Sequence, residues 1–343
     1  MIPDLLRSLL AGQAIAPAAL EEALHAIMLG QEEPARIAAL LVALATQPPQ
    51  ASTLAAAARV LRSHRVAVHA EVRPLIDTCG TGGDGADTFN ISTTAALVVA
   101  AAGAAVAKHG NRAVSSKVGS ADVLEAAGCT LAVQASAART LLDSVGFVFL
   151  FAPAFHPAMA HVAPVRKSLG IRTLFNLLGP LANPALAEVQ LVGVYDPSLT
   201  EVMARALAEL GCQAALVVHC AGMDELGLHD VTLGHRVRDG KVEAFRLAPE
   251  DVGLTRAPLA ALRGKGEAQG NLVLMREVLE GQDGPRADVV ALNAGAALWL
   301  AGRTKDLRQG LDAAREVLRS GAARRVLQRY AESSRPSAGK ESK

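Results

Sequence analysis

Apolar residues in positions 1–70 recur at intervals of three and four, which predicts helices and no strand. Residues 20–27 and 37–44 each carry such a set, and a later helix is expected to begin with Ser52 as its N-cap. Several short helices without a strand predict a small helical domain. We expect this domain to supply the contact face of a homodimer.

After residue 70 the pattern changes to short apolar runs that alternate with helical segments. This alternation is typical of a largely parallel central sheet flanked by helices, so residues 71–330 are assigned to an α/β catalytic domain. Asp239-Gly240 predicts a hairpin with a type I′ turn over residues 231–247. The polar residues 331–343 are expected to form a disordered tail. Strands are predicted at 74–79, 104–108, 147–151, 190–195 and 214–219, and helices at 92–102, 121–127, 136–145, 198–210, 271–280, 287–301 and 306–328.

Composition narrows the classes of partner. The chain has 343 residues, of which 51% are hydrophobic, 20% charged and 3% aromatic, and its formal net charge is +1. The apolar share is enough for a large core. The neutral charge and the few aromatic rings argue against a nucleic-acid partner, which needs a basic surface or stacking platforms.

No segment is predicted to cross a membrane. The most apolar stretch, residues 95–107, is shorter than the roughly 20 residues that span a bilayer, and the apolar run at 5–10 is too short for a signal peptide. The four cysteines lack the close pairs of a zinc site and are too few for a disulfide scaffold. We therefore expect a cytoplasmic protein with reduced thiols and no membrane partner.

Candidate chemistry begins at the end of the first predicted strand. Gly80-Thr81-Gly82-Gly83-Asp84-Gly85 holds four glycines in six residues, so its main-chain N–H groups can approach an anion closely. Asn90-Ile91-Ser92-Thr93 then opens an apolar helix, and helix N-termini bind phosphate. Taken alone, such a loop is more typical of a tight turn. It matches neither the Walker P-loop nor the dinucleotide-binding pattern.

A basic and polar run follows the second predicted strand. Lys108-His109-Gly110-Asn111-Arg112 is followed by Ser115-Ser116-Lys117 and by Gly119-Ser120. Three cations, a histidine and three serines suit several phosphate oxygens. An exposed loop with Ser120 as a helix N-cap would explain that serine but not the density of donors.

Asp224-Glu225 follows the strand that is predicted to end at His219. Carboxylates at the carboxyl end of a strand point into the crevice where α/β folds bind ligands. Oxygen ligands without competing imidazoles suit Mg²⁺, which bridges to substrate phosphates. In isolation, such a pair is more typical of a solvated turn.

In this order the motifs resemble those of the anthranilate phosphoribosyltransferase family. The likeness covers residues 1–328, and it implies a nucleoside phosphorylase/phosphoribosyltransferase-like fold. It also implies transfer of the 5-phosphoribosyl group from phosphoribosyl diphosphate to the amine of anthranilate, with release of diphosphate, in tryptophan biosynthesis. The matching segments are Asp77-Thr-Cys-Gly-Thr-Gly-Gly-Asp-Gly, Phe89-Asn-Ile-Ser-Thr, Lys108-His-Gly-Asn-Arg through Ser120-Ala-Asp-Val-Leu-Glu, His156-Pro-Ala-Met, Val165-Arg166, residues 173–184 and Gly222-Met-Asp-Glu.

The resemblance implies roles for individual residues. Ser92, Asp224 and Glu225 would hold Mg²⁺, and Arg166 would face the anthranilate carboxylate. The predicted catalytic residues are Lys108, His109, Asn111 and Arg166. The predicted substrate-binding residues are Gly80, Gly83, Asp84, Thr88, Asn90, Ile91, Ser92, Thr93, Lys108, Asn111, Arg112, Ser115, Ser116, Ser120 and Arg166.

The sequence departs from the family's usual pattern in three places. Asp230-Val231-Thr232 stands where the family has Gly-Pro-Thr, Cys220 replaces a glycine, and Ala182 replaces a common threonine. None of these is a predicted ligand, so the expected consequence is an altered loop near the metal.

The implied reaction needs charge stabilisation more than proton transfer. The leaving diphosphate is highly anionic, so Mg²⁺ with Lys108, Arg112 and Lys117 would stabilise the charge that develops on it. A neutral arylamine is already nucleophilic, so we predict no essential general base, only positioning by Asn111 and Arg166. His109 would assist the late loss of the amine proton.

Alternatives remain open from the residues alone. A pyrimidine nucleoside phosphorylase of the same architecture is not expected to combine Asn90-Ile-Ser-Thr with Lys108-His-Gly-Asn-Arg. A paralogue could use another aromatic acceptor, although Arg166 favours one with a carboxylate. A non-catalytic interaction protein would have no reason to retain the metal and phosphate groups together.

Overall fold

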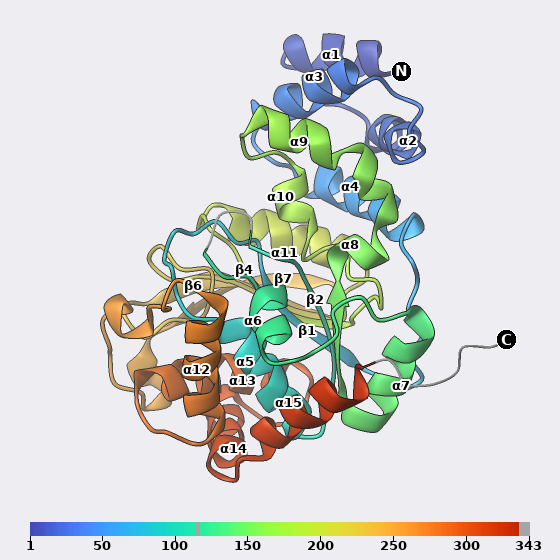
Figure 1. Cartoon of the computed structure of the whole chain (residues 1–343). Coiled ribbons are helices and arrows are strands. Elements are labelled where there is room, and N and C mark those ends of the chain that lie inside the picture. Colours follow the sequence, from blue (N-terminus) through green and yellow to red (C-terminus); the bar gives the residue numbers. More distant parts are fainter. Residues whose placement is uncertain (114–116, 336–343) are drawn as a thin grey trace, which may run out of the picture.

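The computed structural model is an elongated molecule, with a helical unit at one end and a helix-covered sheet at the other (Figure 1). The structure describes residues 1–113 and 117–335. Within these residues every helix is too short or too polar to pass through a membrane.

The N-terminal residues fold into four helices, in agreement with the apolar pattern. Leu20, Leu40 and Leu54 are fully buried where these helices pack together. The predicted N-cap is wrong, because Gln50 is extended and the last of these helices begins directly after it, which leaves Ser52 inside the first turn. The helices are α1 (Ile2–Leu10), α2 (Pro17–Met28), α3 (Pro34–Ala45) and α4 (Ala51–Ser63).

A second stretch of chain, for which no element was predicted, completes the helical unit. Val162, Val165 and Phe175 are buried in the same core as the N-terminal helices. The elements of this stretch are four to seven residues long, too short to show a helical period. They are α8 (Ala152–Phe155), η1 (Pro157–His161), α9 (Ala163–Leu169) and α10 (Phe175–Leu178).

The predicted strands form one seven-stranded sheet in the order β3-β2-β1-β4-β5-β6-β7. The first five strands pair in parallel, and β6 and β7 add an antiparallel hairpin. Asp239 and Gly240 both have positive φ (51° and 74°), which confirms the type I′ turn. The strands are β1 (Leu75–Gly80), β2 (Ala105–Gly110), β3 (Phe147–Phe151), β4 (Val189–Gly193), β5 (Ala214–His219), β6 (Thr232–Arg238) and β7 (Lys241–Leu247).

Alternate residues of each central strand enter two different cores. Val192 and Val217 pack with α11 (Leu199–Glu209) and the helical unit, whereas Leu191 and Leu216 pack with the helices on the opposite face. Figure 1 accordingly shows α11 between the sheet and the helical unit. The remaining elements are α5 (Ile91–Ala101), α6 (Ser120–Ala126), α7 (Ala135–Val145), η2 (Pro249–Val252), η3 (Leu259–Leu262), α12 (Ala268–Leu279), α13 (Pro285–Leu300), α14 (Leu307–Arg319) and α15 (Ala322–Ser333).

The single helix predicted at 306–328 is wrong. The chain forms α14 and α15 with Gly321 between them in the left-handed region (φ 64°), where glycine meets no steric penalty. This break allows the last helix to turn back against the sheet.

The last helix protects the edge strand β3. Tyr330 is fully buried, and its hydroxyl oxygen accepts a hydrogen bond of 3.1 Å from the main-chain N–H of Phe149. Its ring also meets the Phe147 ring edge-on, with 4.8 Å between centroids. An outward N–H of the edge strand is thus paired within the protein.

Tyr330→Phe is expected to lower the free energy of unfolding by about 1–3 kcal/mol, because the buried Phe149 N–H loses its acceptor. Urea unfolding monitored by circular dichroism measures the change. Tyr195→Phe, at the other tyrosine, is the control, because no hydrogen bond of that hydroxyl is seen within the described residues. Equal stability of wild type and Tyr330→Phe would contradict this account of the edge strand.

Candidate active site

The predicted site residues gather at the carboxyl ends of the parallel strands. The main-chain N–H of Gly82, after β1, donates a 2.9 Å hydrogen bond to Oδ2 of Asp224, after β5, 142 residues away in sequence. The N–H of Asp224 in turn donates to Oδ2 of Asp84 at 3.2 Å. The glycine-rich loop and the acidic pair therefore form one site.

Two glycines make this approach possible. A Cβ on Gly80 would lie 2.3 Å from Oδ2 of Asp224, and one on Gly193 would lie 1.4 Å from the carbonyl oxygen of Asp224. Real Cβ atoms do not approach other atoms this closely. A side chain at position 193 would displace the main chain that carries the acidic pair, and one at position 80 would push the Asp224 carboxylate out of its place.

The N-terminus of α5 meets the second carboxylate. The main-chain N–H of Ser92 donates to Oε1 of Glu225 at 3.1 Å, a position where the helix dipole favours negative charge. Asn90 precedes the helix, and its side chain donates to the carbonyl of Val118 at 3.2 Å. Ile91 and Thr93 are each 1% exposed, so the protein encloses both residues, main chain included, in this structure.

Lys108 is buried within strand β2 and is not exposed on a loop. It is 2% exposed, and its ammonium donates to the carbonyl of Thr78 and, at 3.3 Å, to Oγ of Ser92. Its charge also opposes the effect of burial on the pKa of Glu225. In this structure Lys108 supports the start of α5.

The acidic pair has the electrostatics of a cation site. Asp224 and Glu225 keep some exposed surface, but protein atoms surround their carboxylates. This desolvation raises the pKa of Glu225 to about 7 and, with repulsion from Asp84 and Glu225, raises the pKa of Asp224 well above its usual range. A divalent cation would relieve both effects.

The donor set fits magnesium in particular. Oxygen atoms of Asp224, Glu225 and Ser92 lie together, and Mg²⁺ is held in many enzymes by one or two carboxylates plus substrate phosphates. Residues 1–113 and 117–335 contain no set of three or more His, Cys, Asp or Glu side chains arranged to hold a metal ion. Such a set is not required where the substrate supplies ligands.

A buried polar network fixes the base of the site. Asp77 is fully buried and accepts hydrogen bonds from the His109 N–H (3.2 Å) and the Asn183 side chain (2.8 Å). Asn183 also donates to the carbonyl of Ala107 at 2.8 Å. Desolvation raises the pKa of Asp77 to about 6, while Lys108 opposes the rise. The network joins β1, β2 and the segment at 173–184.

His109 has one nitrogen engaged and one free. Nδ1 lies 3.0 Å from the carbonyl oxygen of Gly179, whereas Nε2 is buried and has no hydrogen-bond partner among the described residues. Burial, and then the neighbouring His156, lowers the pKa of His109 to about 3. Its ring is therefore neutral near pH 7, with Nδ1–H donating to the carbonyl and Nε2 left as an acceptor.

Two residues of the basic and polar run after β2 already contact other protein groups. Arg112 forms ion pairs with Asp122 (3.0 Å) and Glu125 (2.7 Å) of α6. Ser120 is the first residue of α6, and Gly119 is the N-cap, so the alternative of Ser120 as N-cap is wrong. Its hydroxyl instead donates to the carbonyl of Asn111 at 3.2 Å. Ser115 and Ser116 lie outside the described residues.

Arg166 comes from the helical unit. It lies on α9, half-buried, with its guanidinium carbon 5.5 Å from the centroid of the Phe175 ring. Burial lowers its pKa, though the group stays charged at neutral pH. Thr88 forms an isolated β-bridge with Arg263, which closes the far end of the glycine-rich loop.

Three supporting residues were not predicted. Arg172 donates to the carbonyl of Gly83, and Asn271 donates to Oδ1 of Asn90 at 3.1 Å. Asn293, fully buried on α13, accepts from the Leu226 N–H at 3.1 Å and donates to the Leu226 carbonyl at 2.9 Å. The available signal for Asn293 was a single amide within residues 289–300 of α13, which are otherwise apolar.

At each of the three places that depart from the family pattern, the loop is held by contacts within the protein. Cys220 is fully buried, and its main chain exchanges two 2.9 Å hydrogen bonds with Met223. A Cβ on Gly227 would lie 2.4 Å from Sγ of Cys220, so the larger residue at 220 depends on a glycine opposite. Asp230 pairs with Arg256 at 3.5 Å, and the carbonyl of Ala182 accepts from His156 at 2.9 Å.

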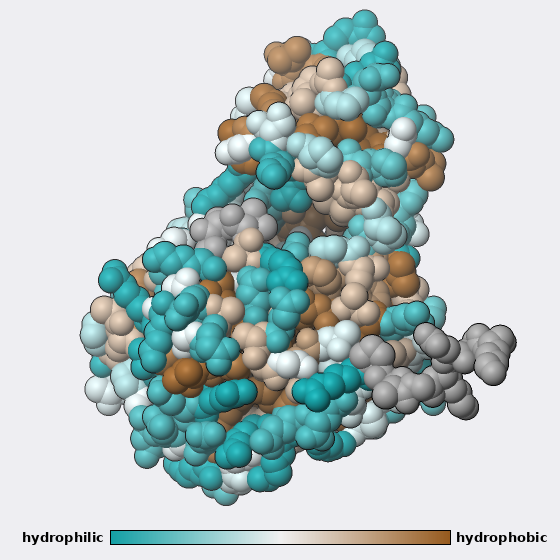
Figure 2. All heavy atoms as spheres, in the orientation of Figure 1, coloured by the Kyte–Doolittle hydropathy of each residue, from teal (hydrophilic) through white to brown (hydrophobic). Residues whose placement is uncertain are grey.

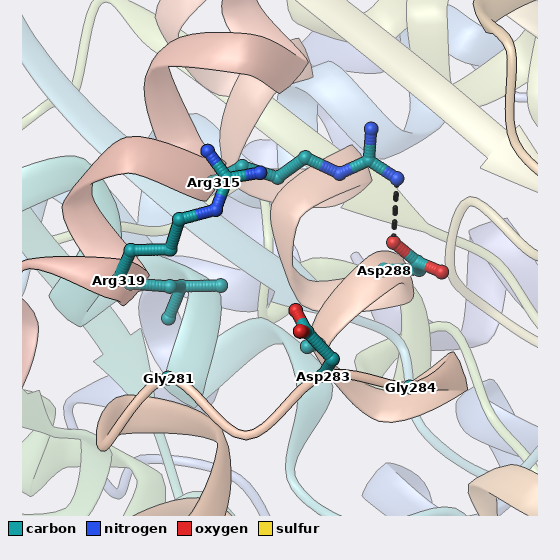
Figure 3. Close-up of a pocket in the computed structure, with 8 residues that line it drawn as sticks. Gly281, Asp283, Gly284, Asp288, Arg315 and Arg319 are labelled. Atoms are coloured by element: carbon teal, nitrogen blue, oxygen red, sulfur yellow. Dashed lines mark hydrogen bonds and ion pairs between the residues drawn. The ribbon is translucent and has the colours of Figure 1, made fainter.

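A hollow between α13 and α14 does not belong to this site. Figure 3 shows its lining, which includes Gly284, Arg319 and the Asp288–Arg315 ion pair at 2.7 Å. None of the residues predicted to bind substrate or metal lines it.

Comparison with known proteins points to one family. Residues 3–65 match the helical bundle domain of a glycosyl transferase family, and residues 72–324 match its a/b domain. An anthranilate phosphoribosyltransferase of Symbiobacterium thermophilum is 51% identical over 330 residues, which cover 96% of each chain. One from Sorangium cellulosum is 46% identical over 339 residues, covering 98% of this chain and 97% of the relative.

Solved structures agree. The crystal structure of anthranilate phosphoribosyltransferase from Thermus thermophilus has a TM-score of 0.91 and 48% identity, and the match covers 96% of this chain and 99% of that one. The enzyme from Saccharomyces cerevisiae in complex with PRPP (phosphoribosyl diphosphate) and Mg has a TM-score of 0.88 and 29% identity, with 97% of each chain covered.

The imidazole of His109 is expected to stay neutral as the pH falls from 8 to about 4, because its pKa is lowered to about 3. Below about pH 6.5 the unfolded chain takes up a proton that the folded chain refuses, so His109 lowers stability progressively towards pH 3. NMR of ¹⁵N-labelled histidine side chains measures the titration, with His109→Gln to assign the signal. A midpoint near pH 6.5 would contradict the enclosed, neutral ring.

Proposed function

This chain belongs to the anthranilate phosphoribosyltransferase family, and we propose how its own residues carry out the family's reaction. The enzyme transfers the 5-phosphoribosyl group from phosphoribosyl diphosphate to the amine of anthranilate and releases diphosphate, in tryptophan biosynthesis. The observation that carries the assignment of residues is the contact of the glycine-rich loop and the α5 N-terminus with Asp224-Glu225.

The sugar diphosphate is assigned to the crevice between the glycine-rich loop and α5. Free main-chain N–H groups of a glycine-rich loop and a helix N-terminus both favour phosphate oxygens. Gly80, Gly83 and Asp84 would line one side, with Asn90 and Thr88 at the far end. The complex of the yeast enzyme with PRPP and Mg supports this class of ligand.

Magnesium is assigned to Ser92, Asp224 and Glu225. The raised carboxylate pKa values support a cation site, and both residues are only half-buried, so the site lies near the surface of the crevice. When bound, the ion would supply positive charge beside the leaving diphosphate. Lys108, held against Ser92, adds a fixed positive charge near the Glu225 carboxylate.

Anthranilate is assigned to the side of the crevice nearest the helical unit. Arg166 offers a guanidinium for the carboxylate, and the yeast enzyme has been solved with 4-fluoroanthranilate, which carries the same group. Asn111, an exposed residue directly after β2, is assigned to orient the amine. Nε2 of His109, which has no hydrogen-bond partner among the described residues, is a neutral acceptor, but it is buried and the amine would reach it only after neighbouring groups move.

The residues support displacement of diphosphate without a strong base. A group with a pKa near 3 is a weak base, so His109 would accept the amine proton only after the new C–N bond has formed. The amine needs no prior deprotonation, because the neutral arylamine carries the lone pair that attacks. Arg112 can act on the diphosphate only by leaving its ion pairs with Asp122 and Glu125.

The function is tested by mixing purified protein, Mg²⁺, phosphoribosyl diphosphate and anthranilate and following the loss of anthranilate fluorescence. Loss that requires all components supports the transferase. Phosphorolysis of thymidine without this activity would favour a nucleoside phosphorylase, and turnover of another carboxylated arylamine in preference would favour a paralogue.

Arg166→Ala is expected to raise the KM for anthranilate about tenfold or more while leaving that for the sugar diphosphate nearly unchanged, because only the acceptor loses a charged partner. Initial rates at varied concentrations of each substrate separate the two. Lys167→Ala, at the neighbouring exposed cation, is the matched control. An equal rise in both KM values would contradict the assignment.

Glu225→Gln is expected to lower activity about 100-fold or more and to shift its Mg²⁺ dependence to higher concentration, because a charged ligand is removed. The fold should persist, since the amide oxygen can still accept from Ser92. Rates over a Mg²⁺ titration test this, with the exposed Glu243→Gln as control. An unchanged titration curve would exclude Glu225 as a ligand.

The helical unit is assigned to a homodimer contact. Figure 2 shows apolar surface on this unit, and the exposed large apolar residues there include Leu10 (81% exposed), Leu29 (58%) and Val42 (40%). Leu10 ends α1 and Val42 lies on α3, and these two helices pack together. Exposed apolar side chains on helices that pack together are the type of surface that a second copy covers.

Val42→Glu is expected to convert the dimer to a monomer, because the interface would bury an unpaired charge. Light scattering after size-exclusion chromatography at micromolar concentration measures the mass. Val273→Glu is the matched control, since Val273 is 39% exposed but lies on α12 in the α/β domain. A monomeric wild type would refute the dimer.

A further inference from the structure

Arg172 connects the two halves of the site. It lies between α9 and α10, six positions after Arg166, and its guanidinium donates to the main-chain carbonyl of Gly83. The residue is exposed, and among the described residues it forms no ion pair within 4 Å. A cation from the acceptor side of the crevice is thus bonded to the loop on the phosphate side.

Tyr195 holds this cation in place. The guanidinium carbon of Arg172 lies 3.9 Å from the centroid of the Tyr195 ring, well within cation–π distance. The main-chain N–H of Tyr195 also donates to Oγ1 of Thr81 at 3.2 Å. The chain after β4 therefore supports the glycine-rich loop directly at Thr81 and, through Arg172, at Gly83.

The hydrogen bond at Gly83 orients a peptide of the loop. In a trans peptide the C=O and the following N–H point in opposite directions. When Arg172 draws the Gly83 carbonyl towards itself, the N–H of Asp84 turns to the other side of the loop. Gly83 has a φ of +78° and no side chain, so this peptide can rotate easily unless another group fixes it.

We propose that Arg172 is a positioning residue that couples the glycine-rich loop to the helical segment that carries Arg166. Filling of the loop by diphosphate then steadies Arg172 and its segment, and the acceptor site tightens. By linkage, the acceptor tightens the loop for diphosphate by the same factor. This inference rests on the proposed function of the loop and of Arg166.

The test measures coupling with a pair of ligands that cannot react. Calorimetry gives the Kd of anthranilate for the wild type with and without saturating Mg²⁺ and diphosphate. The ratio of the two values is expected to be on the order of tenfold, within the usual range of coupling. In Arg172→Met, which keeps an apolar stem over Tyr195 but no donor, the ratio should fall towards one.

Further variants separate coupling from general damage. Arg172→Lys keeps the charge but loses the planar fork, so its ratio should also fall. Tyr195→Leu should reproduce the loss, whereas Tyr195→Phe retains the ring and should preserve the ratio. Arg236→Met removes another cation–π contact, with Trp299 at 5.5 Å, and should keep the wild-type ratio.

The outcomes distinguish the two proposals. An active wild type with the same ratio in Arg172→Met, or a wild-type ratio of one, would overturn the coupling and leave the transferase assignment standing. A wild type with no transferase activity would overturn both. Coupling lost in Arg172→Met and Tyr195→Leu but kept in Arg236→Met would establish the role of Arg172.

Discussion

The structure depends on the approach of Asp224-Glu225 to the glycine-rich loop. Two carboxylates surrounded by protein cannot both stay ionised at low cost unless a cation joins them. The fold nevertheless holds them together through main-chain donors at Gly82 and Ser92. The protein therefore carries a local instability, which the proposed binding of magnesium with the sugar diphosphate would remove.

Several remote features make sense as supports of this approach. Glycine is required at 80 and 193 because a Cβ would displace Asp224. Asn293 binds both main-chain groups of Leu226, directly after Glu225, and its helix α13 also packs on α5, whose N-terminus meets the same carboxylate. One helix thus sets both sides of the contact. Its buried amide is a positional constraint rather than a source of net stability.

Local patterns in the sequence were sufficient for the sheet and for the motifs of the site. The ends of strands and the types of turns are determined by residues adjacent in the sequence. The type I′ turn at Asp239-Gly240 and the position of Asp224-Glu225 after a strand could therefore be predicted. Side-chain partners could not. The enclosure of Lys108 and the ion pairs of Arg112 depend on residues far along the chain or on another element. The joining of α9 to the N-terminal helices is likewise a tertiary effect, without a local period.

The proposed position of the acceptor site depends on that tertiary effect. Arg166 belongs to a segment whose apolar residues are buried with α1–α4, whereas the glycine-rich loop directly follows strand β1 of the sheet. The two substrates are therefore assigned to two units with separate attachments, and the reacting atoms must meet between them. Proximity contributes to catalysis only when both substrates are held at the correct distance and orientation. A cation that reaches from one unit to a main-chain carbonyl of the other, as Arg172 reaches Gly83, would in our proposal hold the two units in that arrangement.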